Sequence, residues 1–390
     1  MKHVHESRKV AATFKGDAAS SARWNRWKNR VGRLTLMLSC ALFALPLSLR
    51  AADPLPTMGP DGMPPPPPPD YVARPLTVRP VAIQPSRIST LNFEPGSPAG
   101  GRVAVVVEAG LFASVSNSLV TYAADLTAHG FAPFAVTFSG SAEQLRELLA
   151  GYYAEEASLA GAVLVGDLPY AVWEMIKTFD TSAYEANICD IFFMDLDGTW
   201  EDNNATAPFA AGRYDTRGGD LLCEIWVTRI AAENMSVSGQ TAASLVNGYF
   251  TRNHAYRSGS TSVAKKALHY TDNDWSGKAG TDVRELSAVY SSVTSRVCGV
   301  HAGTGGADYR DNHLPSNVEL IQVRCHGAAT AHVWDDGVNV TSSDYLAKDP
   351  HAVFYNLYTC SGGDFTVVNN LSRMAVMNPA AGGLAAWSHS

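Results

Sequence analysis

The sequence predicts an α/β protein with a mainly parallel sheet, organised as two α/β subdomains side by side. Short, continuous apolar runs such as VAVVVEA (103–109) and GAVLVGD (161–167) are typical of strands that are buried on both faces. Amphipathic segments with helical spacing lie between these runs, and the connecting turns are short. Strand–helix alternation of this kind favours a parallel sheet covered by helices. With 390 residues, 46% of them apolar, the chain can bury a core of that size.

The first half supplies three strands in sequence order. They are expected at 103–109, 131–138 and 161–167. A helix over 116–130 ends at Gly130, which suits a helix stop. The next helix, over 141–156, begins with a capping box formed by Ser141 and Gln144.

The second half repeats this alternation. Strands are expected at 224–230, 265–272, 318–327, 352–360 and 382–388, and helices at 240–256, 283–297 and 366–377. We therefore divide the chain into an N-terminal α/β subdomain over 101–257 and a C-terminal α/β subdomain over 258–390.

Residues 1–52 are expected to be a signal peptide. Nine Lys and Arg residues, against two acids, run through Arg33, and 16 residues without charge (34–49) follow, with Pro46 among them. A membrane anchor needs roughly 20 apolar residues, so cleavage near Ala51 or Ala52 is favoured over a transmembrane span. Cys40 is also compatible with a lipoprotein anchor, but apolar residues continue well past it. The mature protein is expected to be secreted, or located at the cell surface or in the periplasm.

Residues 53–100 form a Pro-rich spacer. The unbroken run from Pro64 to Pro69 favours polyproline II over a packed element, and a short strand followed by a linker is expected after Pro75. Whether this stretch also inhibits the enzyme as a propeptide is left open, although its composition favours a spacer.

Charge and cysteine content narrow the functional classes. Beyond Arg33, 21 basic residues face 35 acidic ones, and a net charge of −14 argues against nucleic acid or an anionic membrane as a partner. Without Cys40, five cysteines remain. Because five is odd, at least one thiol is expected to stay outside any disulfide.

Two predicted strands end in residues that carry chemistry. One ends in Cys325-His326-Gly327, and the other ends in Cys360-Ser361-Gly362-Gly363. Cysteine catalysis needs a thiolate, an imidazole and backbone N–H donors for the oxyanion, and parallel sheets gather catalytic groups at the carboxyl ends of their strands. Each feature alone is common, but the pair predicts a nucleophile at Cys360 and an acid/base at His326. Cys325 points to the opposite face of its strand and is expected to pack.

The order strand-His-Gly and then strand-Cys resembles the caspase-like clan CD peptidases. Within that clan, CSGGDF (360–365) is similar to the Cys-x-x-Gly-Asp-Phe turn of gingipains. GAVLVGDLP (161–169), EIWVTRI (224–230) and GGLAAWS (382–388) also resemble strands of that group. The resemblance runs from about residue 102 to the end of the chain. It implies a caspase/gingipain-like fold and a cysteine peptidase that forms a thioester.

The same resemblance implies roles for further residues. Cys360 becomes the nucleophile, His326 the acid/base, and the N–H groups of Gly327 and Cys360 the oxyanion donors. The carboxylate that steadies the histidine falls on Asp272, an Asp where gingipains have Glu. Asp282 lies near the position of an acid that selects arginine in the specificity pocket, although a helix N-cap role is the stronger expectation for it.

A competing motif follows the third strand. IFFMDLDGTW (191–200) reads as an apolar strand followed by Asp195-x-Asp197, which is similar to the first motif of haloacid-dehalogenase-like Mg²⁺ phosphatases. Lys265 or Lys266 and the Asp272/Asp274 pair are loose matches to the later motifs. The oxygen-rich set Asp195, Asp197 and Asp202 also suits a structural Ca²⁺, which the gingipain resemblance implies as well. An acidic, solvated loop is the third interpretation.

The favoured function is a secreted cysteine endopeptidase that acts on protein or peptide substrates, with no cofactor for catalysis and with a possible structural Ca²⁺. The phosphatase and a non-catalytic gingipain-like surface protein are the alternatives. Because the chain stops soon after the last predicted strand, we expect further C-terminal residues to complete the specificity pocket. The preferred cleavage site is left open.

Overall fold

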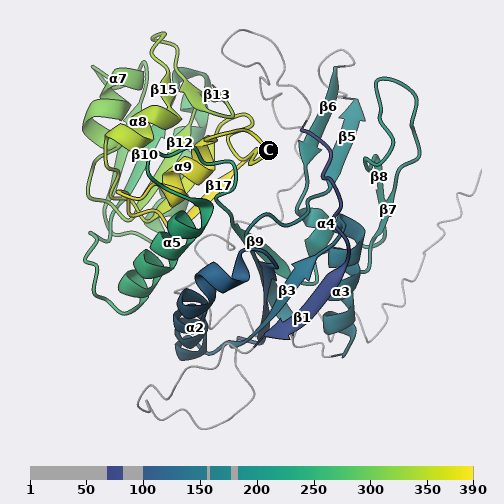
Figure 1. The fold of residues 1–390 in the computed structure, drawn as a ribbon. Helices are drawn as coiled ribbons and strands as arrows, with labels where there is room; N and C mark the ends of the chain where they lie inside the picture. Colours follow the sequence, from purple (N-terminus) through teal and green to yellow (C-terminus); the bar gives the residue numbers. More distant parts are fainter. Residues whose placement is uncertain (1–67, 82–99, 156–158, 177–182, 390) are drawn as a thin grey trace, which may run out of the picture. The chain divides into compact units, whose positions relative to one another are not determined.

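Two five-stranded sheets organise the residues that the computed structural model describes, namely 68–81, 100–155, 159–176 and 183–389 (Figure 1). The expected signal peptide and residues 53–67 and 82–99 of the expected Pro-rich spacer lie outside these ranges. The strand–helix alternation and the flanked parallel sheets confirm the α/β class and are consistent with a caspase/gingipain-like fold.

The first sheet is parallel except for one edge strand. Its order is β1-β3-β2-β4-β9, and β1 pairs antiparallel with β3. The strands are β1 (Thr77–Val81), β2 (Arg102–Glu108), β3 (Ala132–Ser139), β4 (Leu159–Val165) and β9 (Trp226–Ile230). Val103 to Val107 in β2 are at most 1% exposed, as the continuous apolar run predicts for a central strand. The expected short strand within the spacer is therefore the edge strand β1.

Helices α2 (Phe112–Ala128) and α3 (Ala142–Glu155) connect the strands of this sheet. The helix stop at Gly130 and the capping box at Ser141 are both present in the structure. Gly130 adopts φ +86°, and Ser141 and Gln144 exchange the two capping-box hydrogen bonds at 2.9 and 3.3 Å. Two hairpins follow along the chain, β5 (Val172–Ile176) with β6 (Tyr184–Ile188) and β7 (Thr199–Glu201) with β8 (Thr216–Gly218).

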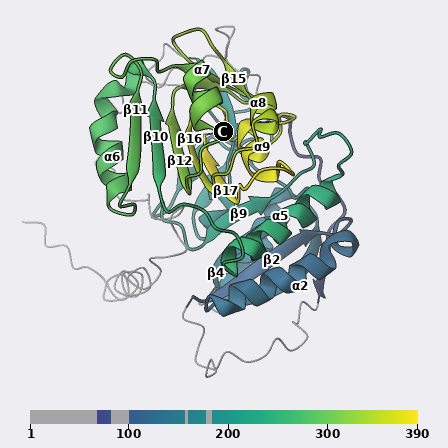
Figure 2. The same ribbon diagram turned by 90° about the vertical axis from the view of Figure 1, so that its left-hand side faces the viewer.

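The second sheet is wholly parallel, in the order β11-β10-β12-β16-β17. Its strands are β10 (Ala267–Thr271), β11 (Val293–Val297), β12 (Leu320–Arg324), β16 (Phe354–Tyr358) and β17 (Ala385–Ser388). Helix α6 (Ala279–Ser287) packs on one face, where Leu286 joins the buried Ala267 and Leu320 (Figure 2). The opposite face carries the larger core, with Leu268, Val323 and Leu357 among its members.

The remaining elements of the second half follow β9 in the chain. They are α5 (Ala242–Arg257), the 3-10 helix η1 (Asn273–Lys278), α7 (Gly306–Asp308), the π-helix η2 (Tyr309–His313), α8 (Ser342–Ala347), α9 (Leu371–Met377) and the three-stranded sheet of β13 (His326–Ala328), β14 (Ala331–Val333) and β15 (Val340–Thr341).

Three local predictions were wrong. The expected helix over 283–297 is helix α6 followed by strand β11, because β-branched VTSRV pairs with β10 along its whole length. The apolar run at 191–194 is the short helix α4 (Ile191–Met194) and not a strand. Helix α9 starts at Leu371, with Asn370 as its N-cap, because residues 360–369 form turns.

Candidate functional site

His326 and Cys360 lie at neighbouring strand ends of the second sheet. Strands β12 and β16 are adjacent, and their last residues, Arg324 and Tyr358, face each other in register. Each predicted catalytic residue is two positions past this pair. The N–H of Cys325 donates to the Tyr358 carbonyl at 3.2 Å, so the two segments remain hydrogen-bonded just past the end of β12. Neighbouring strands are about 4.8 Å apart, which brings the two residues side by side.

The residues just before the predicted dyad are buried. Cys325 and Thr359 are 1% and 2% exposed, and Cys325 belongs to the large core on the face opposite α6. Cys360 itself lies in the turn that follows β16. The expectation that Cys325 packs is confirmed. Thr359 Oγ1 also donates to the His326 carbonyl at 3.1 Å and ties the two strand ends together.

Gly327 permits this close approach. A Cβ at this position would lie 1.8 Å from Thr359 Oγ1 and 2.6 Å from the Ala331 carbonyl oxygen. Only glycine fits there, so the backbone after His326 lies directly against the residue that precedes Cys360.

The turn after Cys360 is held in one conformation by many bonds. Ser361 adopts φ +53°, a left-handed conformation that is rare outside glycine. The Gly362 carbonyl accepts hydrogen bonds from the N–H of Ser372 (3.1 Å), its hydroxyl (2.9 Å) and the Asn370 amide (3.0 Å). Gly363 N–H donates to the His389 carbonyl. The start of α9 and the end of β17 therefore fix the backbone that presents Cys360.

The imidazole of His326 is held from one side. Its Nε2 lies 2.7 Å from Asp274 Oδ2, and its ring contacts the Trp275 ring at a centroid distance of 4.4 Å. Both partners come from η1, which follows β10. Hydrogen bonding to a carboxylate makes Nε2 the protonated nitrogen and leaves Nδ1 to exchange protons. Sequence reasoning missed Asp274 in this role and considered it only within the phosphatase motif.

Asp272, the acid expected to support the histidine, follows β10 and is close enough to His326 for their charges to interact. It is fully buried, and its carboxylate accepts from the backbone N–H groups of Asn273 (2.9 Å) and Asp335 (3.3 Å). Burial, together with the nearby Asp335, raises the pKa of Asp272 to about 6. The carboxylate that contacts His326 is thus that of Asp274, because the chain turns into η1 at Asp272 and brings the later residue over the imidazole.

Asp282 lies within the first turns of helix α6. Helix α6 has Lys278 as its N-cap, so the N-cap role was wrong. The Asp282 carboxylate is 6% exposed and forms two hydrogen bonds of 3.0 Å with the Arg324 guanidinium. His269 Nε2 lies 3.3 Å away. These bonds hold the pKa of Asp282 below its ordinary value despite burial, and they leave no open carboxylate for a substrate arginine.

Burial raises the pKa of the other described cysteine thiols. It raises the pKa of Cys189 and of Cys298 to about 11, and it raises that of Cys325 well above its ordinary value. Burial also raises the pKa of Cys223, although this residue is exposed overall. None of the five described cysteines is in a disulfide, which confirms the expectation from the odd count.

The acidic loop brings together a set that differs from the expected one. Oxygen atoms of Asp195, Asp197 and Glu224 lie within 4.8 Å of one another. Asp202 instead accepts from the Gly212 N–H at 2.7 Å. Three carboxylates suit a hard cation such as Ca²⁺. However, both oxygens of Asp195 are already engaged, one by Gly198 N–H (2.8 Å) and the other by Arg217 (2.6 Å). The cation would thus have to share or replace Arg217.

The same geometry argues against phosphoryl chemistry at Asp195. The residue is fully buried, it follows the short helix α4, and Arg217 already neutralises it. A phosphatase nucleophile needs an accessible carboxylate at the end of a strand.

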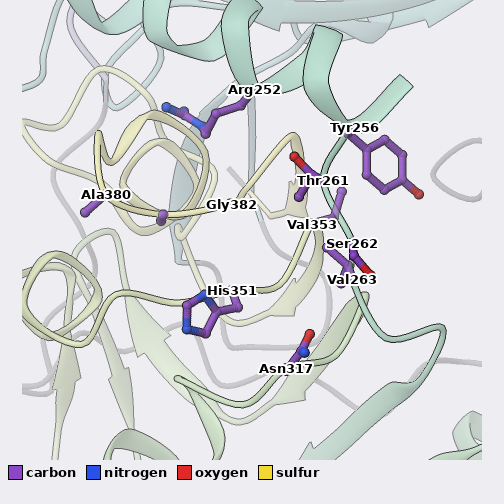
Figure 3. Close-up of a pocket in the computed structure, with 11 residues that line it drawn as sticks. Arg252, Tyr256, Thr261, Ser262, Val263, Asn317, His351, Val353, Ala380 and Gly382 are labelled. Atoms are coloured by element: carbon purple, nitrogen blue, oxygen red, sulfur yellow. The ribbon is translucent and has the colours of Figure 1, made fainter. Parts of the chain in front are cut away.

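One cavity of the described residues lies away from the predicted site. It has a volume of about 380 Å³ and is lined by residues of α5 and by loops that lead into β12 and β16, including Arg252, Asn317, His351 and Val353 (Figure 3). Asn317 and Val353 precede the amino ends of their strands. In a parallel sheet that is the edge opposite His326 and Cys360, so this cavity is separate from the predicted dyad.

Comparison with known proteins decides the family. The model of peptidase family C25 matches residues 103–390. The chain belongs to peptidase family C25. Family C25 is the gingipain family of clan CD, a family of cysteine-type peptidases. The match covers all strands except β1, including both strands that end at His326 and Cys360.

Two further comparisons set limits. A solved structure named "Structure of Protease" aligns with the C25 protein at a TM-score of 0.51 and 16% identity, over 74% of this chain and 59% of that one. At this identity the likeness concerns the fold alone. A comparison with curated proteins finds no match. Within the described ranges, no helix is long and apolar enough to cross a membrane.

Proposed function

We propose that this C25 peptidase is a secreted endopeptidase that cleaves peptide bonds with Cys360 as nucleophile and His326 as acid/base. One observation carries the proposal. The two residues follow the in-register pair Arg324 and Tyr358 on adjacent parallel strands, so both lie at the same edge of the sheet. The peptidase family, which requires a thiol nucleophile, supports it independently.

The chemistry follows from these positions. The Cys360 thiol gives its proton to His326 Nδ1 as its sulfur attacks the carbonyl carbon, and the resulting oxyanion accepts hydrogen bonds from the N–H groups of Gly327 and Cys360. The C–N bond then breaks as His326 Nδ1 donates a proton to the leaving amine, which leaves a thioester on Cys360. Water adds to the thioester and gives its proton to His326, and the carboxylic acid departs as the thiol is restored. Asp274 holds the imidazole in the required orientation throughout.

Secretion and calcium belong to the same proposal. The basic and then apolar start of the chain supports export through a signal peptide. Asp197 and Glu224, with Asp195, would hold a structural Ca²⁺. If so, millimolar Ca²⁺ raises the midpoint of thermal unfolding of the wild type and not that of D197N/E224Q. An equal shift in both proteins, or none in the wild type, removes calcium from the proposal.

The decisive experiment combines thiol labelling with hydrolysis. Brief treatment with iodoacetamide, followed by mass spectrometry, is expected to label Cys360 ahead of the exposed Cys223. C360A is expected to abolish cleavage of a quenched fluorescent protein substrate. H326A is expected to slow cleavage by about 100-fold or more, the usual contribution of an acid/base group.

Two matched variants make this result specific. C223S removes an exposed thiol, and H351A removes an exposed imidazole at the opposite edge of the sheet. Both are expected to cleave like the wild type. If cleavage survives in C360A, or if H326A and H351A behave alike, the dyad is wrong. An unreactive Cys360 in a folded, exported protein would favour the non-catalytic surface protein instead.

A further inference from the structure

Three side chains lie next to the predicted dyad at the end of the second sheet. Arg324, Tyr358 and His389 occupy adjacent positions on β12, β16 and the continuation of β17, since Arg324 pairs with Tyr358 and Leu357 pairs with Ser388. Arg324 and Tyr358 precede His326 and Cys360 by two residues, at the strand ends from which the chain leads to the dyad. We call this row the floor of the site.

The three side chains of the floor contact one another in sequence. The Arg324 guanidinium lies 4.0 Å from the Tyr358 ring centroid, and the Tyr358 and His389 rings meet edge to face at 4.8 Å. On its other side, Arg324 forms the two 3.0 Å bonds with Asp282, a residue of α6. Only 15% of the Arg324 side chain is exposed, and only 7% of the Asp282 side chain.

The substrate residue that precedes the scissile bond must come close to this floor, because its carbonyl carbon becomes bonded to Cys360 Sγ. If its side chain is long and extends along the α6 face of the sheet, it contacts Tyr358 and Arg324. Without Arg324, the end of such a side chain would meet the buried Asp282 carboxylate, which is complementary to a cation. With Arg324 present, that carboxylate is neutralised, and a positive charge stands in the way.

We propose that Arg324 determines the specificity of this peptidase: it fills the arginine- or lysine-binding space above Asp282, so that the enzyme rejects basic side chains before the scissile bond and accepts short, uncharged ones. A substrate guanidinium would have to displace a tethered one that already has two hydrogen bonds and an aromatic partner. Discrimination of this kind works by blocking the wrong ligand. The proposal rests on the proposed function, because it places the substrate on Cys360.

A peptide library that varies the residue before the scissile bond tests this proposal. Wild type is expected to cleave after arginine at least about 100-fold less efficiently than after its best residue, a ratio typical of a site with a misplaced polar group. R324S is expected to gain cleavage after arginine and lysine by about tenfold or more over wild type. D282N/R324S is expected to lose that gain, because no carboxylate remains.

Binding of an amidinium probe separates this proposal from the failure of the proposed function. Calorimetry with benzamidine on C360A and C360A/R324S requires no turnover, and binding is expected only to the second protein. Efficient cleavage after arginine by wild type, or benzamidine binding to C360A alone or equally to both, overturns the proposal. If R324S does not fold, R324T, whose small β-branched side chain suits a strand, takes its place in both assays. The absence of benzamidine binding to a folded C360A/R324T would then overturn the proposal.

Discussion

At the scale of single residues, three carboxylates near the predicted dyad have different hydrogen-bond partners. Asp274 contacts His326, Asp272 bonds backbone amides, and Asp282 pairs with Arg324. The three acids lie within eleven positions of one another in the sequence. Their environments nevertheless range from a side chain that is 53% exposed, for Asp274, to complete burial for Asp272. Each therefore makes a separate prediction.

Substitution of Asp274 by asparagine should slow catalysis. The amide retains a hydrogen-bond acceptor but loses the charge that holds Nε2 protonated, so we expect the rate of hydrolysis to fall by roughly tenfold and the fold to be unaffected. Steady-state kinetics of D274N and of E285Q, an exposed acid on α6, would measure the effect. Equal rates for D274N and E285Q would show that Asp274 does not support the histidine.

The raised pKa of Asp272 predicts a pH-dependent stability. Between about pH 4, where the carboxyl ionises in the unfolded chain, and about pH 6, where it ionises in the folded protein, the folded state holds the extra proton. The contribution of this carboxyl to the free energy of unfolding is therefore complete below about pH 4 and lost as the pH rises through 6. The loss amounts to at most about 3 kcal/mol.

D272N should remove this dependence. Chemical unfolding of wild type and D272N at pH 4, 5, 6 and 7 is expected to show a stability difference that shifts in favour of D272N as the pH rises. A difference that stays constant over this range would mean that Asp272 ionises normally in the folded protein.

At the scale of elements, the segment Pro68–Val81 is attached to the first sheet along its length. Strand β1 pairs with β3, Arg74 forms ion pairs with Glu108 and Asp167, and Asp70 pairs with Arg213 at 3.0 Å. Tyr170 donates to the Pro69 carbonyl at 2.7 Å. These contacts involve the carboxyl ends of β2 and β4, so the end of the Pro-rich spacer is a structural part of the subdomain.

Truncation would measure that contribution. A chain that starts at Pro68 should unfold at the same temperature as the chain that starts at Asp53. A chain that starts at Arg102 should unfold at least several degrees lower, because it loses the edge strand and its ion pairs. If the shortest chain is equally stable and more active, the segment acts as an inhibitor and not as a support.

At the scale of the whole molecule, the turn that presents Cys360 is also held by residues of the first half. Phe365 lies 4.7 Å from the Arg229 guanidinium and 5.6 Å from the Tyr170 ring. Asn234 donates to the carbonyls of Phe365 and Thr366, at 3.1 Å each. The Asp-Phe end of the Cys-x-x-Gly-Asp-Phe motif therefore connects the nucleophile turn to the strand end of β9.

Removal of the Phe365 ring should affect activity as well as stability. F365A is expected to cost about 1–3 kcal/mol of unfolding free energy and to lower the rate of hydrolysis, whereas F365Y should retain both. Chemical denaturation and steady-state kinetics would measure these effects, with V368A, an exposed apolar position of the same turn, as the control. Loss of stability with normal kinetics in the fraction that remains folded would limit Phe365 to packing.

Much of this molecule could be predicted from local patterns. Runs such as RVAVVVE predicted central strands because only a strand buried on both faces tolerates continuous apolar residues. The Ser141/Gln144 box predicted a helix start through bonds between near neighbours. Where patterns were ambiguous, prediction failed: VTSRV reads equally well as a helix tail, and only its pairing with β10 makes it a strand.

By itself, the sequence determined the α/β class, the peptidase family and the two strand ends at His326 and Cys360, because periodicity and short motifs are local properties of the chain. The tertiary structure alone decided the partners of those residues. Asp274 meets a histidine 52 positions away, and Asp282 meets an arginine 42 positions away. Such contacts depend on sheet register and on where η1 and α6 place their side chains, and no local pattern encodes either one.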